Sequence, residues 1–143
     1  MQININGKKY ELNFGIRFVM LMNQKHNANS NGMTLGMGIN QATVVLAQND
    51  VVGLAEILEC ATWINKDRPT INQIYAFIDN PKTNIDKLFE QVKHELTTSN
   101  ATRTQVKNMM KTMKAAQARA MKRAQAEGTK QSTMKLGSTL SLI

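Results

Sequence analysis

The clearest helix in the sequence is the stretch DVVGLAEILECATWI, residues 50–64. Asp50 stands at its start and can accept hydrogen bonds from the free amides of the first turn, as a helix N-cap does. Apolar residues then repeat at the spacing of one buried face, namely Leu54, Ile57, Leu58, Ala61 and Ile64. This stretch predicts a helix at the core of a small, mainly helical fold.

A β-hairpin is predicted at the start of the chain. Asn6-Gly7 is typical of a two-residue turn, because both residues tolerate positive φ. The apolar residues that alternate on the two flanking strands are Ile3, Ile5, Tyr10, Leu12 and Phe14. A hairpin alone is marginal in water, so this apolar face must rest on the rest of the fold.

Two helices and a loop are expected between the hairpin and Asp50. The first helix covers about residues 15–26, with Ile16, Val19 and Met20 facing inward. Residues 27–38 are rich in Asn, Ser and Gly and predict a loop. The second helix covers about residues 39–48, with Ala42, Val45 and Leu46 inward.

Two more helices follow residue 64. Thr70 and Gln73 form a capping-box pattern that begins a short helix, which Asn80-Pro81 ends. An amphipathic helix covers about residues 84–97. The sequence therefore predicts a mainly α fold of the α+β type. An N-terminal β-hairpin would pack on a bundle of about five helices, and a long C-terminal helix would follow.

The net charge of +8 is unevenly distributed. Residues 1–99 contain nine Lys and Arg and nine Asp and Glu, so this part is neutral. Residues 100–143 contain nine Lys and Arg against one acidic residue, Glu127. We expect a helical body over 1–99 and a basic Met- and Ala-rich segment over 100–143.

The basic segment predicts one long helix over about residues 102–127, because it is rich in strong helix formers. Gly128 is expected to end it, and residues 129–143 are expected to be flexible. A short heptad-like seam is formed by Val106, Met110, Met113, Gln117, Ala120 and Ala124.

Three roles are open for this helix: packing on its own body, contacting nucleic acid, or docking on another protein. The absence of aromatic residues for base stacking weighs against nucleic acid without excluding it. Methionine adapts to varied apolar partners, which favours docking. The candidate partner-binding residues are the apolar Val106, Met109, Met110, Met113 and Met121 and the cationic Lys107, Lys111, Lys114 and Arg119.

No catalytic, metal-binding or cofactor-binding constellation stands out. His26 and His94 lie in different elements and lack a second ligand at metal spacing. Cys60, the one cysteine, lies among core positions of a helix and is expected to be a buried, inert thiol. No apolar run approaches the roughly 18 residues of a membrane helix. We therefore expect a protein that is not an enzyme, binds no membrane and acts by binding.

The order of several short stretches resembles the tail assembly chaperones of long-tailed phages of Gram-positive bacteria. The resemblance begins with ININGKKYELNFGIRF over residues 3–18, the expected hairpin and the start of the first helix. It continues through GMGI at 36–39 and DVVGLAEILECAT at 50–62. It ends with RPTI at 68–71 and IDKLF at 85–89. The basic segment lies outside it.

This resemblance implies a chaperone that binds the tape measure protein and keeps it soluble until the tail tube polymerises. It also implies action in the host cell cytoplasm, absence from the mature virion and, in many members, a longer frameshifted form. Self-association and contact with the tail tube protein are further possibilities. Two alternatives stay open: a nucleic-acid-binding accessory protein that uses the basic helix, and a structural component of the virion.

Overall fold

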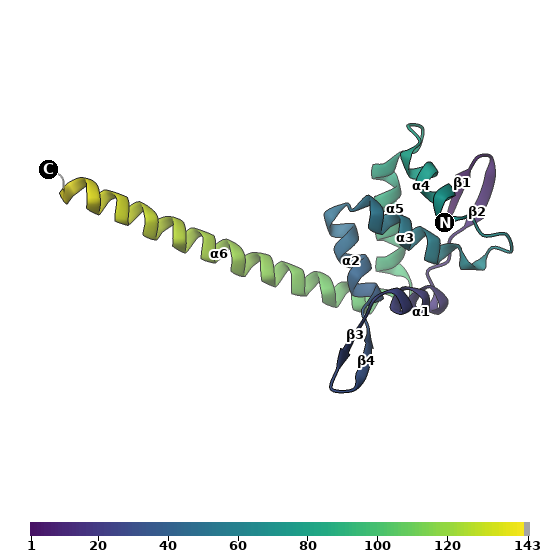
Figure 1. Ribbon diagram of the computed structural model, residues 1–143, viewed down its shortest axis with the longest axis horizontal. Coiled ribbons are helices and arrows are strands. Elements are labelled where there is room, and N and C mark those ends of the chain that lie inside the picture. Colours follow the sequence, from purple (N-terminus) through teal and green to yellow (C-terminus); the bar gives the residue numbers. More distant parts are fainter. Residues whose placement is uncertain (142–143) are drawn as a thin grey trace. The chain divides into compact units, whose positions relative to one another are not determined.

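The computed structural model describes the backbone of residues 1–141 and the side chains of residues 1–128. Within this range it contains six α-helices and two β-hairpins (Figure 1). It confirms the mainly α fold with an N-terminal hairpin and a long C-terminal helix. The elements are β1 (Gln2–Ile5), β2 (Lys8–Glu11), α1 (Ile16–Lys25), β3 (Asn27–Ser30), β4 (Met33–Gly36), α2 (Gly38–Gln48), α3 (Val51–Ala61), the 3-10 turn η1 (Thr62–Ile64), α4 (Ile71–Asp79), α5 (Ile85–Thr98) and α6 (Arg103–Ser141).

The chain divides into two compact units, Met1–Met109 and Met110–Ile143. Helix α6 begins in the first unit and continues through the second. The first unit holds the hydrophobic core described below. The boundary expected after residue 99, between a helical body and a basic segment, stays a prediction.

The predicted N-terminal hairpin is confirmed. Strands β1 and β2 pair antiparallel, with Ile3 opposite Tyr10. The turn residues Asn6 and Gly7 have φ angles of 52° and 84°, the positive values that a type I′ turn requires. Ile3, Ile5 and Tyr10 are buried and attach the hairpin to the helical core.

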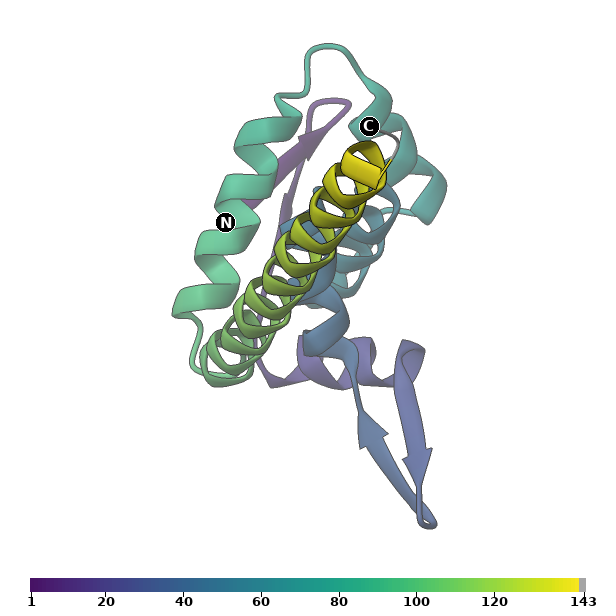
Figure 2. The same ribbon diagram turned by 90° about the vertical axis from the view of Figure 1, so that its left-hand side faces the viewer.

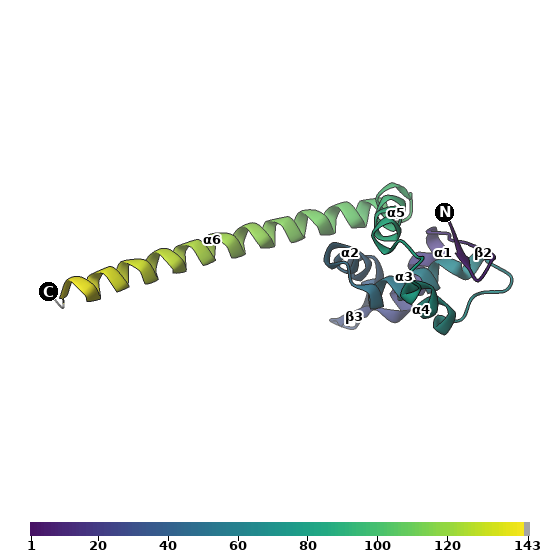
Figure 3. The same cartoon turned by 90° about the horizontal axis from the view of Figure 1, so that it is seen from above.

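Helix α3 is central to the first unit and packs against α1, α2 and α4 (Figures 1 and 3). Its predicted N-cap is present, because the Asp50 carboxylate accepts hydrogen bonds from the amides of Val52 and Gly53. The predicted apolar face from Leu54 to Ala61 is buried. Ile64, which was expected on the same face, lies in η1 and is 45% exposed.

The expected inward face of α1 is wrong at Ile16 and Met20, whereas Val19 packs partly buried against the core as expected. Phe18 and Met22 are fully buried, whereas Ile16 and Met20 are 72% and 48% exposed. Both pairs are spaced four residues apart, so helical periodicity alone could not choose between them. Phe18 meets the Phe14 ring edge-on at a centroid distance of 5.0 Å, and this aromatic contact fixes the helix rotation.

The loop expected over residues 27–38 is also wrong. This segment forms a second hairpin, in which β3 pairs with β4 across the turn residues Asn31 and Gly32. Their φ angles of 50° and 77° repeat the geometry of the first turn. Figure 2 shows the β3–β4 hairpin extending from the end of α1 away from the other elements of its unit.

The expected helices over 70–79 and 84–97 are present as α4 and α5. The capping box of α4 is complete, since Thr70 and Gln73 each bond the other's backbone amide. Asn84 caps α5 through the Lys87 amide. The buried face of α5 consists of Leu88, Phe89, Val92 and Leu96.

Helix α6 does not end at Gly128 as expected, but continues through it to Ser141. A glycine inside a helix costs about 1 kcal/mol relative to alanine, which the helix formers around it offset. The expected flexibility of residues 129–143 stays a prediction. The side chains of that segment, and residues 142 and 143, lie outside the described part of the chain.

Candidate binding surfaces

The methionines of α6 were expected to form an apolar contact surface. Met110 and Met121 are 41% and 65% exposed, and Met109 and Met113 are half-buried. At 3.6 residues per turn these four side chains share one side of the helix. The exposed methionines are therefore available to a partner of varied apolar shape.

Val106 does not belong to this surface. Its side chain is 3% exposed and forms part of the core of the first unit. The preceding turn is also fixed there, because the buried Thr102 hydroxyl donates to the Leu96 carbonyl at 2.7 Å. Val106 is thus a core residue, and its inclusion among the candidate contacts needs correction. Because it is buried in that core, Val106 also cannot be the first residue of the heptad-like seam.

The four cations of the candidate surface, Lys107, Lys111, Lys114 and Arg119, are all exposed. Exposed charges like these contribute little stability, but they raise the rate at which an oppositely charged partner is met. Their arrangement suits a partner or a partner segment with acidic side chains.

The first unit carries a second exposed apolar surface, on the side of α1 that helical periodicity had predicted to be buried. Ile16 and Met20, spaced one helical turn apart, are exposed on α1. Large apolar side chains that gather on a surface mark candidate contact sites. The sequence did contain a signal for this surface. Helix α1 has two apolar pairs with i, i+4 spacing, Ile16 with Met20 and Phe18 with Met22, and only one of them can face the core.

The β3–β4 hairpin is exposed along both strands. Its register places Leu35 opposite Ala28 and Met33 opposite Ser30 on one face, while Asn29 and Thr34 bond each other on the opposite face. Met33 and Leu35 are 64% and 45% exposed. No residue from 27 to 38 is charged. The Asn31-Gly32 dipeptide was the sequence signal for this hairpin.

A hydrogen bond and an ion pair hold the end of α1 against α3 near the base of this hairpin. His26 Nε2 pairs with Glu56, and Lys25 Nζ lies 3.1 Å from the Glu59 carboxylate. The hydrogen bond to Glu59 raises the pKa of Lys25. Glu56 and Glu59, the two acidic residues of α3, therefore have structural roles as partners of α1. His26 has a structural role at the end of that helix.

Cys60 is buried as expected, at 2% exposure. Burial in apolar surroundings raises the pKa of its thiol to about 11. The thiol is therefore protonated at neutral pH, the unreactive form of cysteine.

Neither a metal-binding cluster nor a membrane-spanning helix occurs among the described residues. Among these residues, no three His, Cys, Asp or Glu side chains come close enough together to hold a metal ion. Within the same part of the chain, no helix combines the length and the apolar character needed to cross a membrane.

The exposed features are thus apolar and cationic surfaces on a small helical scaffold. Comparison with protein families gives a more particular assignment. The family model described as "Phage tail assembly chaperone protein, TAC" matches residues 2–111. The chain belongs to this family of phage tail assembly chaperones. Neither the curated proteins nor the solved structures that were searched gave a match.

Proposed function

We propose that this chaperone binds the tape measure protein of a phage tail and keeps it soluble until the tail tube polymerises around it. The observation that carries the proposal is the family match over residues 2–111, which covers all of the first unit except Met1. A long helical client exposes apolar surface that aggregates if it is left uncovered. A chaperone for such a client acts by binding, without catalysis, and in the host cell cytoplasm.

The contacts proposed for the client are the exposed methionines and cations of α6. Met110 and Met121 supply adaptable apolar contact, and Lys111, Lys114 and Arg119 attract acidic segments. Many weak contacts of this kind suit a complex that tube subunits later displace. Such a chaperone is expected to be absent from the finished particle.

The test is co-expression with the tape measure protein encoded beside the chaperone, followed by co-purification at about 0.5 M salt, where exposed charge pairs are strongly screened. We expect the complex to survive and the tape measure to become insoluble without the chaperone. Failure to associate at any salt, with nucleic acid retained instead, would replace the proposal by a nucleic-acid role for the basic helix.

A matched pair of variants separates the methionine surface from a general effect of charge. Met110→Glu/Met121→Glu places two carboxylates on the proposed contact side. Ala115→Glu/Ala126→Glu adds the same charges with the same spacing, about 140° further round the helix. Only the first pair should weaken co-purification at high salt. Equal effects of the two variants would remove the methionines from the binding surface.

A further inference from the structure

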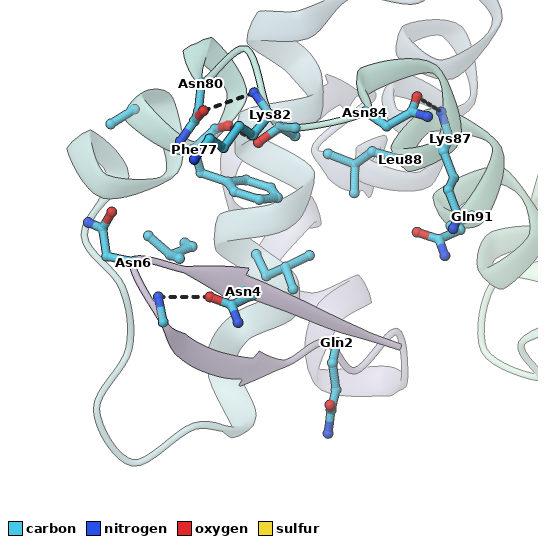
Figure 4. A pocket seen from close by; sticks show the side chains of 15 residues that line it. Gln2, Asn4, Asn6, Phe77, Asn80, Lys82, Asn84, Lys87, Leu88 and Gln91 are labelled. Atoms are coloured by element: carbon cyan, nitrogen blue, oxygen red, sulfur yellow. Dashed lines mark hydrogen bonds between the residues drawn. The ribbon is translucent and has the colours of Figure 1, made fainter.

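A hollow of about 700 Å³ lies between strand β1 and the helices α4 and α5. This volume falls within the roughly 300–1,000 Å³ of typical ligand sites. In Figure 4, Phe77 and Leu88 point from the helices toward β1, while asparagine and glutamine side chains surround the opening. Every residue of β1 lines the hollow and no residue of β2 does.

The edge of β1 that borders this hollow has unpaired backbone groups. The Leu12 amide donates to the Met1 carbonyl at 2.9 Å, so this pair of residues is hydrogen-bonded across the hairpin. In an antiparallel ladder, bonded and non-bonded pairs alternate along the strands. The amides and carbonyls of Gln2 and Asn4 therefore point away from β2, toward the hollow.

The outer edge of β2, on the opposite side of the hairpin, is covered by a side chain, whereas the outer edge of β1 is open. Glu11 donates its amide to Asn65 Oδ1 at 3.0 Å and accepts from Asn65 Nδ2 at 2.8 Å. The Asn65 side chain thus takes the place of a neighbouring strand at this position of β2. Proteins commonly cover or block exposed strand edges, and an edge left open is a template for another strand.

The charge around the hollow is of one sign. Lys82 and Lys87 line it, and none of the described residues that line it is acidic. Lys87 lies in the first turn of α5, where the helix dipole disfavours a cation. A carboxylate bound beside Lys87 would offset this unfavourable interaction.

A second hollow of about 420 Å³ shares Gln2, Lys87 and Gln91 with the first, but Glu90 and Glu95 also line it. An acidic segment is therefore expected in the first hollow and not in the second. We call the first hollow the β1–α5 groove, which is bordered by Gln2–Ile5 on one side and by α5 on the other. The four residues of β1 span about 13 Å at roughly 3.3 Å per residue. An extended segment of about four residues fits along this edge.

We propose that the β1–α5 groove binds an extended acidic segment of the client, which adds as a third strand beside β1. The backbone of Gln2 and Asn4 supplies the strand hydrogen bonds, Phe77 and Leu88 contact apolar side chains, and Lys82 and Lys87 bind a carboxylate. As an assignment of a client site, this inference rests on the proposed function. The recognition chemistry is tested separately with a model peptide.

The probe is a blocked hexapeptide of alternating valine and glutamate, and its counterpart has lysine in place of glutamate. Both are added to the isotope-labelled full-length chain, and backbone amide shifts are followed by NMR. The acidic peptide should shift the amides of Gln2 and Asn4 and slow their hydrogen exchange. Shifts confined to α6, or no shifts at millimolar peptide, would overturn the proposal.

Two variants test the two halves of the site. Lys82→Glu/Lys87→Glu should weaken binding of the acidic peptide about tenfold and strengthen binding of the basic one. Lys66 is an exposed lysine outside the groove, and Lys66→Glu should change neither affinity.

The second variant tests the strand hydrogen bonds. Gln2→Pro removes one outward amide from β1. Lys9→Pro removes an outward amide from β2, at the position opposite Asn4, and serves as its control. Equal loss of binding in both proline variants would contradict strand addition to β1.

The tape measure complex is then compared with the peptide results. If the acidic peptide binds in the groove but no tape measure complex forms, the groove assignment stands and the proposed function fails. If the complex forms while the peptide leaves the groove unchanged, the function stands and the groove assignment fails. Loss of both ligands in Lys82→Glu/Lys87→Glu supports both.

Discussion

Single side chains at helix N-termini define where several helices of this fold begin. Asp50 caps α3 with two amide hydrogen bonds, and the Thr70–Gln73 pair closes the first turn of α4. Each arrangement satisfies amides that a helix cannot bond internally. Such contacts depend on residues two or three apart, so single substitutions test them cleanly.

Replacing Asp50 with alanine should lower the free energy of unfolding by about 1 kcal/mol, because two first-turn amides of α3 lose their acceptor. Urea unfolding followed by circular dichroism measures the change. Asp50→Asn keeps a capping oxygen and should retain most of the stability. An equal loss in both variants would show that the charge matters more than the cap.

The Cys60 thiol predicts a pH dependence of stability. Burial raises its pKa from 9.0 to about 11, so the folded state keeps the proton at pH values where the unfolded state loses it. The free energy of unfolding should therefore be unaffected by this group below pH 9 and fall between pH 9 and 11. Urea midpoints measured across this range should fall more steeply than in Cys60→Ala. Parallel slopes would contradict a raised pKa.

At the scale of elements, the same residue type has opposite roles in two helices. A Cβ added at Gly53 of α3 would lie 2.4 Å from a Val45 methyl group of α2, so glycine is required for this close packing. A Cβ added at Gly128 of α6 would meet nothing within 4 Å. The two positions therefore predict opposite outcomes of one substitution.

Gly128→Ala should raise the helical signal at 222 nm and add up to about 1 kcal/mol to the stability of α6, because alanine is the better helix former. Gly53→Ala should lower the free energy of global unfolding by about 1–3 kcal/mol through overpacking. Both are measured by circular dichroism during thermal unfolding. No gain of helix in Gly128→Ala would favour the earlier expectation that the helix ends there.

At the scale of the whole chain, two truncations test where the first unit ends. A chain ending at residue 109 keeps Val106 and Thr102, and should unfold with nearly the stability of that unit in the full chain. A chain ending at residue 99 lacks both and should lose about 2–4 kcal/mol, from one buried valine and one buried hydrogen bond. Urea titrations of both chains decide between the boundaries, and equal stability would support the boundary after residue 99.

Much of the architecture could be predicted from residues close together in sequence. The Asn6-Gly7 turn, the Asp50 cap and the capping box at Thr70 all follow from local backbone chemistry, and all are present. The second Asn-Gly turn, at Asn31-Gly32, had the same signal, but the Asn, Ser and Gly content of residues 27–38 led to the prediction of a loop.

The candidate sites were less predictable, because they depend on which surface the core leaves uncovered. The cations and methionines of α6 could be identified from composition and helical spacing. The burial of Val106, the exposure of Ile16 and Met20, and the open edge of β1 could not. Each of these depends on contacts between residues that are distant in the chain.

By itself, the sequence determined where most helices begin, where the first hairpin turns and how the charge divides along the chain. These features depend on hydrogen bonds and backbone preferences within a few residues. Only the tertiary structure decided which side of α1 is buried and which hairpin edge Asn65 covers. Both outcomes depend on packing between distant segments, where Phe14 meets Phe18 and Asn65 meets Glu11. Local periodicity carries no information about such contacts.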